Sequence, residues 1–270
     1  MIIIHIGLPK TGTTFLQNSI FKKINDIEII RKSGSTLNLI RDSKKEILFS
    51  SFESYLYNEK EKNLVKQALT SINNIKNIFN NPKIIFGYRN QSEYIKALYL
   101  QSLNGFKFWT FNDFFSLEND NSFFNKNDFL LEQIVYELKQ NFSEVYFYDL
   151  EDLKNNNEKI VNEILNFIGT KNKFKDFEIK NENISIKTEL QLKTLKNLNK
   201  LDSFIPNFLP SLHSKPFKIL GITPRQIAQN HLKNITSKPI ILNGYDKEKI
   251  DNYYKSDWNK IKLIIDKNKN

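Results

Sequence analysis

The chain of 270 residues is long enough for one large α/β domain or two small ones, and it carries a formal net charge of +10. Such a charge favours anionic partners: nucleic acid, acidic polysaccharide, lipid headgroups or a multiply phosphorylated cofactor. The absence of cysteine excludes disulfides, cysteine nucleophiles and thiolate metal sites, and the histidines His5, His213 and His231 are too scattered for a metal cluster. No Pro-, Gly- or Ser-rich linker divides the sequence, so we expect a single domain over residues 1–270.

The sequence contains no stretch that is long and apolar enough to cross a bilayer. Its first residues also lack the basic leader of a signal peptide. We therefore expect a cytoplasmic protein without a transmembrane segment, for which a peripheral membrane contact stays open.

The first expected element is a strand, followed by a glycine-containing loop and a helix. Residues 1–6 form an almost unbroken apolar, β-branched run, which is typical of a short buried parallel strand. Residues 7–14 contain two glycines, a proline and a lysine, and apolar residues then recur at helical spacing over residues 15–21. In this arrangement the loop N–H groups and the first helical turn point at one spot, which predicts a site for an anion such as a phosphate.

The spacing of this loop differs from that of a nucleotide-triphosphate P-loop, G-x-x-x-x-G-K-[ST]. Gly7 and Gly12 have the correct spacing, but Thr13 occupies the lysine position and Lys10 lies inside the loop. The sequence PKTGTT after an apolar strand resembles instead the 5′-phosphosulfate-binding loop of the sulfotransferase family, in particular bacterial members that open H-I-G-x-P-K-T-G-T-T. The resemblance implies that the donor-binding residues of this loop are Pro9, Lys10, Thr11, Gly12, Thr13 and Thr14.

Two further strands are expected over residues 27–31 and 47–49, and the second leads into Ser50, Ser51 and Glu53. Open α/β folds bind ligands at the carboxyl edge of the sheet, where these polar groups would lie. Glu53 is therefore a candidate general base. An equally good interpretation is that Glu53 caps or begins a helix over residues 55–79.

The next strand is expected over residues 83–88, and Arg89 follows it directly. Asn90 and Glu93 have the spacing of a capping box that opens a helix through residue 102. A guanidinium between a strand end and a helix start can grip a phosphate in a bidentate way, although a plain ion-pair role for Arg89 stays open. The stretch resembles the family's 3′-phosphate-binding segment: Arg89 and Tyr99 match it, whereas Ala97 stands where the family usually has a serine hydroxyl.

An aromatic stretch follows over residues 106–115. The simpler interpretation is a loop whose rings pin it to the core, and the alternative is that Trp109 or a neighbouring Phe stacks on the adenine or lines an acceptor cleft. Helices are expected over residues 128–140 and 189–201. Residues 250–265 resemble the terminal helix of the sulfotransferase family.

A strand over residues 145–148 ends at Asp149, which resembles superficially the magnesium-binding carboxylate of a Walker B strand. The longer segment resembles a sulfotransferase segment in which a strand runs into E-D-L and an amphipathic helix ends in F-x-G. The residues that match are Glu151, Asp152, Leu153, Phe167, Ile168 and Gly169. We interpret them as structural, with Gly169 as a left-handed helix cap.

The resemblance as a whole implies a three-layer, P-loop-like α/β fold with a central parallel sheet flanked by helices. It also implies transfer of a sulfuryl group from 3′-phosphoadenylyl sulfate to a hydroxyl or amine acceptor, with adenosine 3′,5′-bisphosphate as product and no metal. Lys10 would act on the bridging and leaving oxygens, the loop amides would bind the 5′-phosphate, and Arg89 would bind the 3′-phosphate. Glu53 is the first candidate for the base, ahead of His5 and His213.

We expect the acceptor to be a small molecule or a glycan. The sequence does not distinguish a polysaccharide, a glycolipid, a peptide tyrosine or a small alcohol, but the basic charge and the bacterial resemblance favour a carbohydrate or glycolipid. Two alternatives stay open. One is a P-loop nucleotide kinase or NTPase that would use Mg-ATP and Asp149, although Thr13 stands in place of the expected lysine. The other is a non-enzymatic basic binding module, but no recognised nucleic-acid motif is present, so we expect no nucleic-acid partner.

Overall fold

The computed structural model describes residues 1–30, 47–50, 63–104, 109–172, 174, 188–202, 238–240 and 242–266. The chain divides into two compact units. The first comprises Met1–Tyr94, Phe123–Asn181 and Lys247–Asn270, and the second comprises Ile95–Ser122 and Glu182–Asp246. The expectation that residues 1–270 act as one domain stays a prediction.

The first unit is built on a parallel sheet, which confirms the expected fold class. Among the described residues, five strands pair in the order β2-β3-β1-β4-β7, and every pair is parallel. The strands are β1 (Ile2–Gly7), β2 (Glu28–Ile30), β3 (Ile47–Ser50), β4 (Lys83–Tyr88) and β7 (Val145–Asp149). Each coincides with a strand expected from an apolar run, to within one or two residues at either end.

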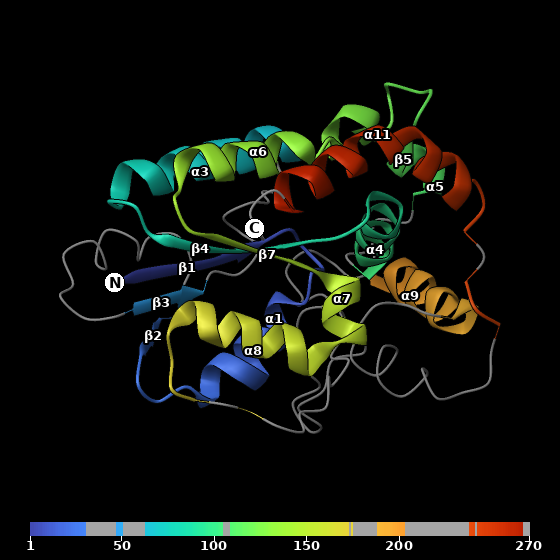
Figure 1. The fold of residues 1–270 in the computed structure, drawn as a ribbon. Coiled ribbons are helices and arrows are strands. Elements are labelled where there is room, and N and C mark those ends of the chain that lie inside the picture. The colour runs from blue at the N-terminus through green and yellow to red at the C-terminus, as the bar shows by residue number, and fades with distance from the viewer. Residues whose placement is uncertain are drawn as a thin grey trace, which may run out of the picture. The chain divides into compact units, whose positions relative to one another are not determined.

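Helices cover both faces of this sheet. In the first unit, one face carries α3 (Leu64–Ile78), α6 (Glu132–Asn141) and α11 (Lys247–Asp266), and the other carries α1 (Thr13–Phe15), α7 (Leu150–Asn155) and α8 (Asn157–Ile168) (Figure 1). Helix α4 (Gln91–Asn104) begins in this unit and continues into the second. None of the described helices is long and apolar enough to span a membrane. Further helical elements are the π-helical turn η1 (Leu16–Ile20) and the 3-10 turns η2 (Phe21–Lys23) and η5 (Lys126–Phe129).

Successive side chains along each strand point to opposite faces of the sheet, so apolar residues are buried on both faces. Ile3 and Tyr148 point into a core cluster with the helical segment after β1 and with α7 and α8. Tyr88 points to the opposite face, where its ring lies 5.7 Å from that of Trp258 on α11. Apolar strands covered on both faces are typical of parallel sheets.

Two expected helices differ from those observed. The helix expected over residues 55–79 begins only at Leu64, because Asn63 is extended and its side chain accepts a hydrogen bond from the N–H of Lys66. Residues 55–62 lie outside the described part of the chain. The helix expected over 128–140 is divided into η5 and α6, because Asn125 and Asp128 form a capping box that starts a separate turn.

The second unit contains the aromatic stretch. Its elements are α5 (Phe111–Phe114), β5 (Phe115–Ser116), α9 (Glu189–Asp202) and the continuation of α4, while the short strand β6 (Phe124–Asn125) belongs to the first unit. The ring of Tyr99 packs against Phe111 and Phe114, and its hydroxyl donates a hydrogen bond to the carbonyl of Trp109 over 2.9 Å. The described rings therefore pack on one another, in keeping with the simpler interpretation of this stretch.

Candidate active site

The loop after β1 has the backbone of an anion-binding nest. Lys10 has φ 65° and Gly12 has φ 86°, so both residues lie in the left-handed region. The helical segment begins directly after Gly12, whose carbonyl accepts the first helical hydrogen bond from the N–H of Leu16 over 3.1 Å. Alternating backbone handedness turns successive N–H groups towards one concave spot at a helix start. A lysine in the left-handed region carries a conformational cost, which is typical of a residue held for function.

Buried hydrogen bonds hold this loop in shape. The hydroxyl of Thr11 has no exposed surface and donates to the carbonyl of Leu8 over 2.7 Å. The N–H of Leu8 in turn donates to the carbonyl of Gly87 on β4 over 3.1 Å. The loop is therefore fixed both to itself and to the neighbouring strand.

Beneath the loop, two glycines make room for two hydroxyls. Gly7 and Gly87 lie opposite each other on β1 and β4. A Cβ on Gly87 would lie 2.3 Å from the Tyr148 hydroxyl oxygen, and a Cβ on Gly7 would lie 2.8 Å from Thr11 Oγ1. The hydroxyl of Tyr148 is hydrogen-bonded to the side chain of Thr11, and burial raises the pKa of Tyr148. Neither Tyr148 nor Gly87 was singled out from the sequence, although a glycine inside an apolar strand signals a close approach.

His5 lies in the same buried cluster. Its Nε2 is 3.2 Å from the hydroxyl of Tyr148, and its ring stands edge-on to Phe21 with the centroids 5.0 Å apart. Burial lowers the pKa of His5 to about 3, so the imidazole is neutral. Since none of the side chain is exposed, its position is that of a core histidine rather than of a base that meets an acceptor from solvent.

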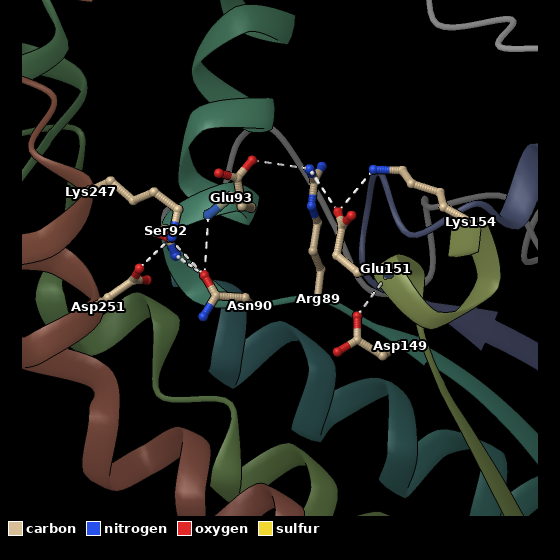
Figure 2. Close-up of polar contacts among 9 residues, drawn as sticks. All are labelled: Arg89, Asn90, Ser92, Glu93, Asp149, Glu151, Lys154, Lys247 and Asp251. Atoms are coloured by element: carbon tan, nitrogen blue, oxygen red, sulfur yellow. Dashed lines mark hydrogen bonds and ion pairs between the residues drawn. The ribbon is translucent and has the colours of Figure 1, made fainter. Parts of the chain in front are cut away.

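Arg89 follows β4 and meets two carboxylates (Figure 2). Its Nη2 lies 3.3 Å from Glu93 Oε2 and 3.5 Å from Glu151 Oε1, and Lys154 Nζ donates to the same Glu151 oxygen over 2.8 Å. The Arg89 side chain is only 12% exposed, so it is an ion-pair residue but not a surface one. Its Nε is buried without a hydrogen-bond partner among the described residues.

The turn that carries Arg89 is anchored at the start of α4. The side-chain oxygen of Asn90 accepts from the N–H and hydroxyl of Ser92, over 3.1 and 2.7 Å. Asn90 therefore caps α4 as expected, while the carboxylate of Glu93 contacts the preceding arginine. Asp251 of α11 hydrogen-bonds Ser92 and Lys247, which ties this turn to the C-terminal helix (Figure 2).

Asp149 ends β7 as a helix cap. Its side chain accepts a hydrogen bond from the N–H of Glu151 over 2.9 Å and opens α7, and burial raises its pKa. This structural role accounts for an acid at the strand end without a magnesium ion. In the described part of the chain, no group of three or more His, Asp or Glu side chains is placed to hold a metal.

The catalytic base predicted from the sequence cannot be placed in this site. Glu53 and His213 lie outside the described residues. Ala97 is buried in α4, in the second unit together with Tyr99. The structure thus brings together the loop around Lys10 and the turn around Arg89, because β1 and β4 end side by side.

The sheet and its loops define a class of fold: a P-loop-like α/β fold in which Lys10 and Arg89 follow two adjacent parallel strands. A family model described as "Sulfotransferase domain" matches residues 2–209, so the chain belongs to the sulfotransferase family. The protein is therefore a transferase that moves sulfuryl groups.

Solved sulfotransferases are also similar to this chain. A sulfotransferase from Alicyclobacillus acidocaldarius is 13% identical with a TM-score of 0.45, over 75% of this chain and 90% of its own. Mouse sulfotransferase SULT7A1, complexed with PAP, is 14% identical with a TM-score of 0.46, over 96% of this chain and 84% of its own. A search of curated proteins found no significant match.

Proposed function

We propose that this protein transfers a sulfuryl group from 3′-phosphoadenylyl sulfate to a hydroxyl or amine acceptor, with adenosine 3′,5′-bisphosphate as the second product. The observation that carries the proposal is the loop after β1, in which Lys10 and Gly12 both have positive φ and a helix starts immediately afterwards. Membership of the sulfotransferase family supports it. No metal is needed, because Lys10 and Arg89 supply positive charge.

The residues present fit such a donor. The N–H groups of Thr11, Gly12, Thr13 and Thr14 belong to the nest and would bind the 5′-phosphate. Gly12 is a strained position for any other residue, because its φ is 86° and a Cβ there would lie 3.0 Å from Leu153 Cδ2 and 3.1 Å from Leu150 Cδ1. Arg89, two residues beyond Gly87, would bind the 3′-phosphate.

The rate of transfer depends on how well Lys10 and the loop amides stabilise the negative charge that develops in the transition state. The ammonium of Lys10 stabilises the negative charge on the bridging oxygen as its bond to sulfur breaks and a bond from the acceptor oxygen or nitrogen to sulfur forms. The loop amides hold the leaving phosphate. Because Thr11 fixes the loop through a buried hydrogen bond, little reorganisation is needed at that moment. Glu53 is our proposed acceptor of the proton from the attacking group.

Ligand-induced thermal stabilisation tests the donor. Adenosine 3′,5′-bisphosphate without metal should raise the melting temperature, and Arg89→Ala should abolish the shift. Stabilisation by Mg-ATP instead would favour a nucleotide kinase. If neither nucleotide stabilises the protein, the proposed donor is wrong.

Lys10 is tested by two substitutions that separate its charge from its backbone. Lys10→Ala should lower kcat by about 10²-fold to 10³-fold while the protein still folds. Lys10→Gly should lose activity equally but gain roughly 1 kcal/mol of stability, because glycine adopts positive φ without cost. Retained turnover in both variants would show that the assigned role of Lys10 is wrong.

The acceptor is proposed to be a carbohydrate or glycolipid, on the basis of the net charge of +10 and of the sequence resemblance to bacterial sulfotransferases. Transfer assays with acidic polysaccharides, glycolipids, a tyrosine peptide and a small alcohol would rank these classes. Preference for the peptide or the small alcohol would contradict this part of the proposal. Cytoplasmic location belongs to the same proposal and is tested by fractionation of cells.

A further inference from the structure

The ion pairs of Arg89 are long, and both use the same nitrogen. Charge-assisted bonds between a guanidinium and a carboxylate usually measure about 2.7–2.9 Å and often use two nitrogens. Here one nitrogen, Nη2, serves both Glu93 at 3.3 Å and Glu151 at 3.5 Å (Figure 2). Neither carboxylate therefore holds the plane of the guanidinium, and Nε is buried without a hydrogen-bond partner among the described residues. A buried donor left in this way has a free-energy cost that a better-placed anion would remove.

The two carboxylates would respond differently to such an anion. Glu151 also accepts from Lys154 over 2.8 Å, so it keeps a cation if Arg89 turns away. The carboxylate of Glu93 has Arg89 as its hydrogen-bonded ion-pair partner within the described residues, and Lys247 is a more distant positive neighbour. Within that part of the chain, release of Arg89 would leave Glu93 with only the more distant Lys247 as a positive neighbour, beside the bound anion.

We infer that Glu93 is a specificity-determining residue, which competes with a nucleotide 3′-phosphate for Arg89 and so weakens the preference for 3′-phosphorylated ligands. This inference rests on the proposed function. A phosphate that uses Nε and Nη2 of Arg89 takes the nitrogen that Glu93 now contacts, and the displaced carboxylate repels it.

A positioning role for Glu93 is the opposite possibility. A carboxylate that orients an arginine should contact two of its nitrogens at short distance. The single contact of 3.3 Å favours competition over positioning.

Calorimetric titration with two nucleotides distinguishes these roles. Adenosine 3′,5′-bisphosphate and adenosine 5′-phosphate differ only in the 3′-phosphate. In Glu93→Gln, we expect the Kd of the bisphosphate to fall roughly five- to tenfold at low salt, while the Kd of the monophosphate changes less than about twofold. The gain should shrink at high salt and disappear when Arg89→Ala is added to Glu93→Gln. The matched control is Glu137→Gln on α6, whose carboxylate accepts from Asn141 of the same helix, and it should change neither Kd.

Three results for the Glu93 variants would overturn the inference while leaving the proposed donor intact. Weaker bisphosphate binding in Glu93→Gln would show that Glu93 orients Arg89. Equal tightening of both nucleotides would place the effect away from the 3′-phosphate. An unchanged Kd for both nucleotides in Glu93→Gln, with the fold verified by circular dichroism and repeated in Glu93→Ala, would show that Glu93 does not compete. If the wild-type protein binds neither nucleotide, the proposed donor itself fails, and the inference fails with it.

Discussion

The buried imidazole of His5 should make the stability of this protein depend on pH in the acid range. Burial lowers the pKa of His5 from 6.5 to about 3, so the unfolded chain takes up a proton that the folded protein excludes. The free energy of unfolding therefore falls as the pH drops through this interval. At about 1.36 kcal/mol per pKa unit, the loss between about pH 7 and about pH 5 is roughly 2 kcal/mol.

Asp257 changes the stability with pH in the opposite direction, so its contribution must be separated from that of His5. Burial raises the pKa of Asp257 to about 6, so the folded state binds a proton more readily than the unfolded state. This carboxyl adds stability as the pH falls below about 6, and the net change in the wild-type protein is smaller than that of His5 alone. The comparison with His5→Gln cancels the contribution of Asp257.

Urea denaturation of both proteins at neutral pH and at about pH 5 provides the assay. The wild-type protein should lose about 2 kcal/mol more than His5→Gln over this interval. Gln can still donate towards the hydroxyl of Tyr148, which lies 3.2 Å from His5 Nε2, so the change with pH is the readout rather than the stability at one pH. Equal losses in the two proteins would refute the claim that burial holds His5 neutral.

Three further substitutions and one control substitution test groups around the site and at the start of α6. Tyr148→Phe should weaken adenosine 3′,5′-bisphosphate binding roughly tenfold in calorimetry, because its hydroxyl bonds the loop. The control is Tyr146→Phe, which loses a 2.7 Å hydrogen bond to a carboxylate of α8 and should leave the affinity for the bisphosphate unchanged. If both variants weaken binding equally, Tyr148 does not position the loop. Gly87→Ala places a Cβ 2.3 Å from the Tyr148 hydroxyl and should cost at least about 2 kcal/mol, which an unchanged melting temperature would disprove. The carboxylate of Asp257 accepts hydrogen bonds from the N–H groups of Leu131, just before α6, and of Glu132, its first residue. Asp257→Asn weakens these bonds and should lower the free energy of unfolding by about 2 kcal/mol in urea denaturation. An unchanged midpoint would show that the two bonds do not stabilise the protein.

Local patterns were enough to predict the sheet and the loop. Short apolar runs marked the strands now seen as β1, β4 and β7, and the spacing of Gly7, Lys10 and Gly12 marked the turn. The cap of α8 at Gly169, with φ 84°, was predicted in the same way. Each of these features depends on residues that are close together in the sequence.

Contacts between distant segments could not be predicted in this way. Glu151 meets Arg89 because β7 lies beside β4, and the sequence carries no local sign of that neighbour. Asp149 illustrates the same limit. An acid after an apolar strand is expected both for a metal ligand and for a helix cap, and only the bond to the Glu151 N–H identifies the cap.

The shape of the anion-binding loop depends on side chains that are missing beneath it. Gly7 and Gly87 are paired across β1 and β4, and the space that their absent Cβ atoms leave is taken by the hydroxyls of Thr11 and Tyr148. Thr11 then fixes the carbonyl of the loop residue Leu8. A larger residue at either glycine would move these hydroxyls before it touched any ligand. The positions that control the loop therefore include residues of β4 and β7, which no motif confined to the loop would reveal.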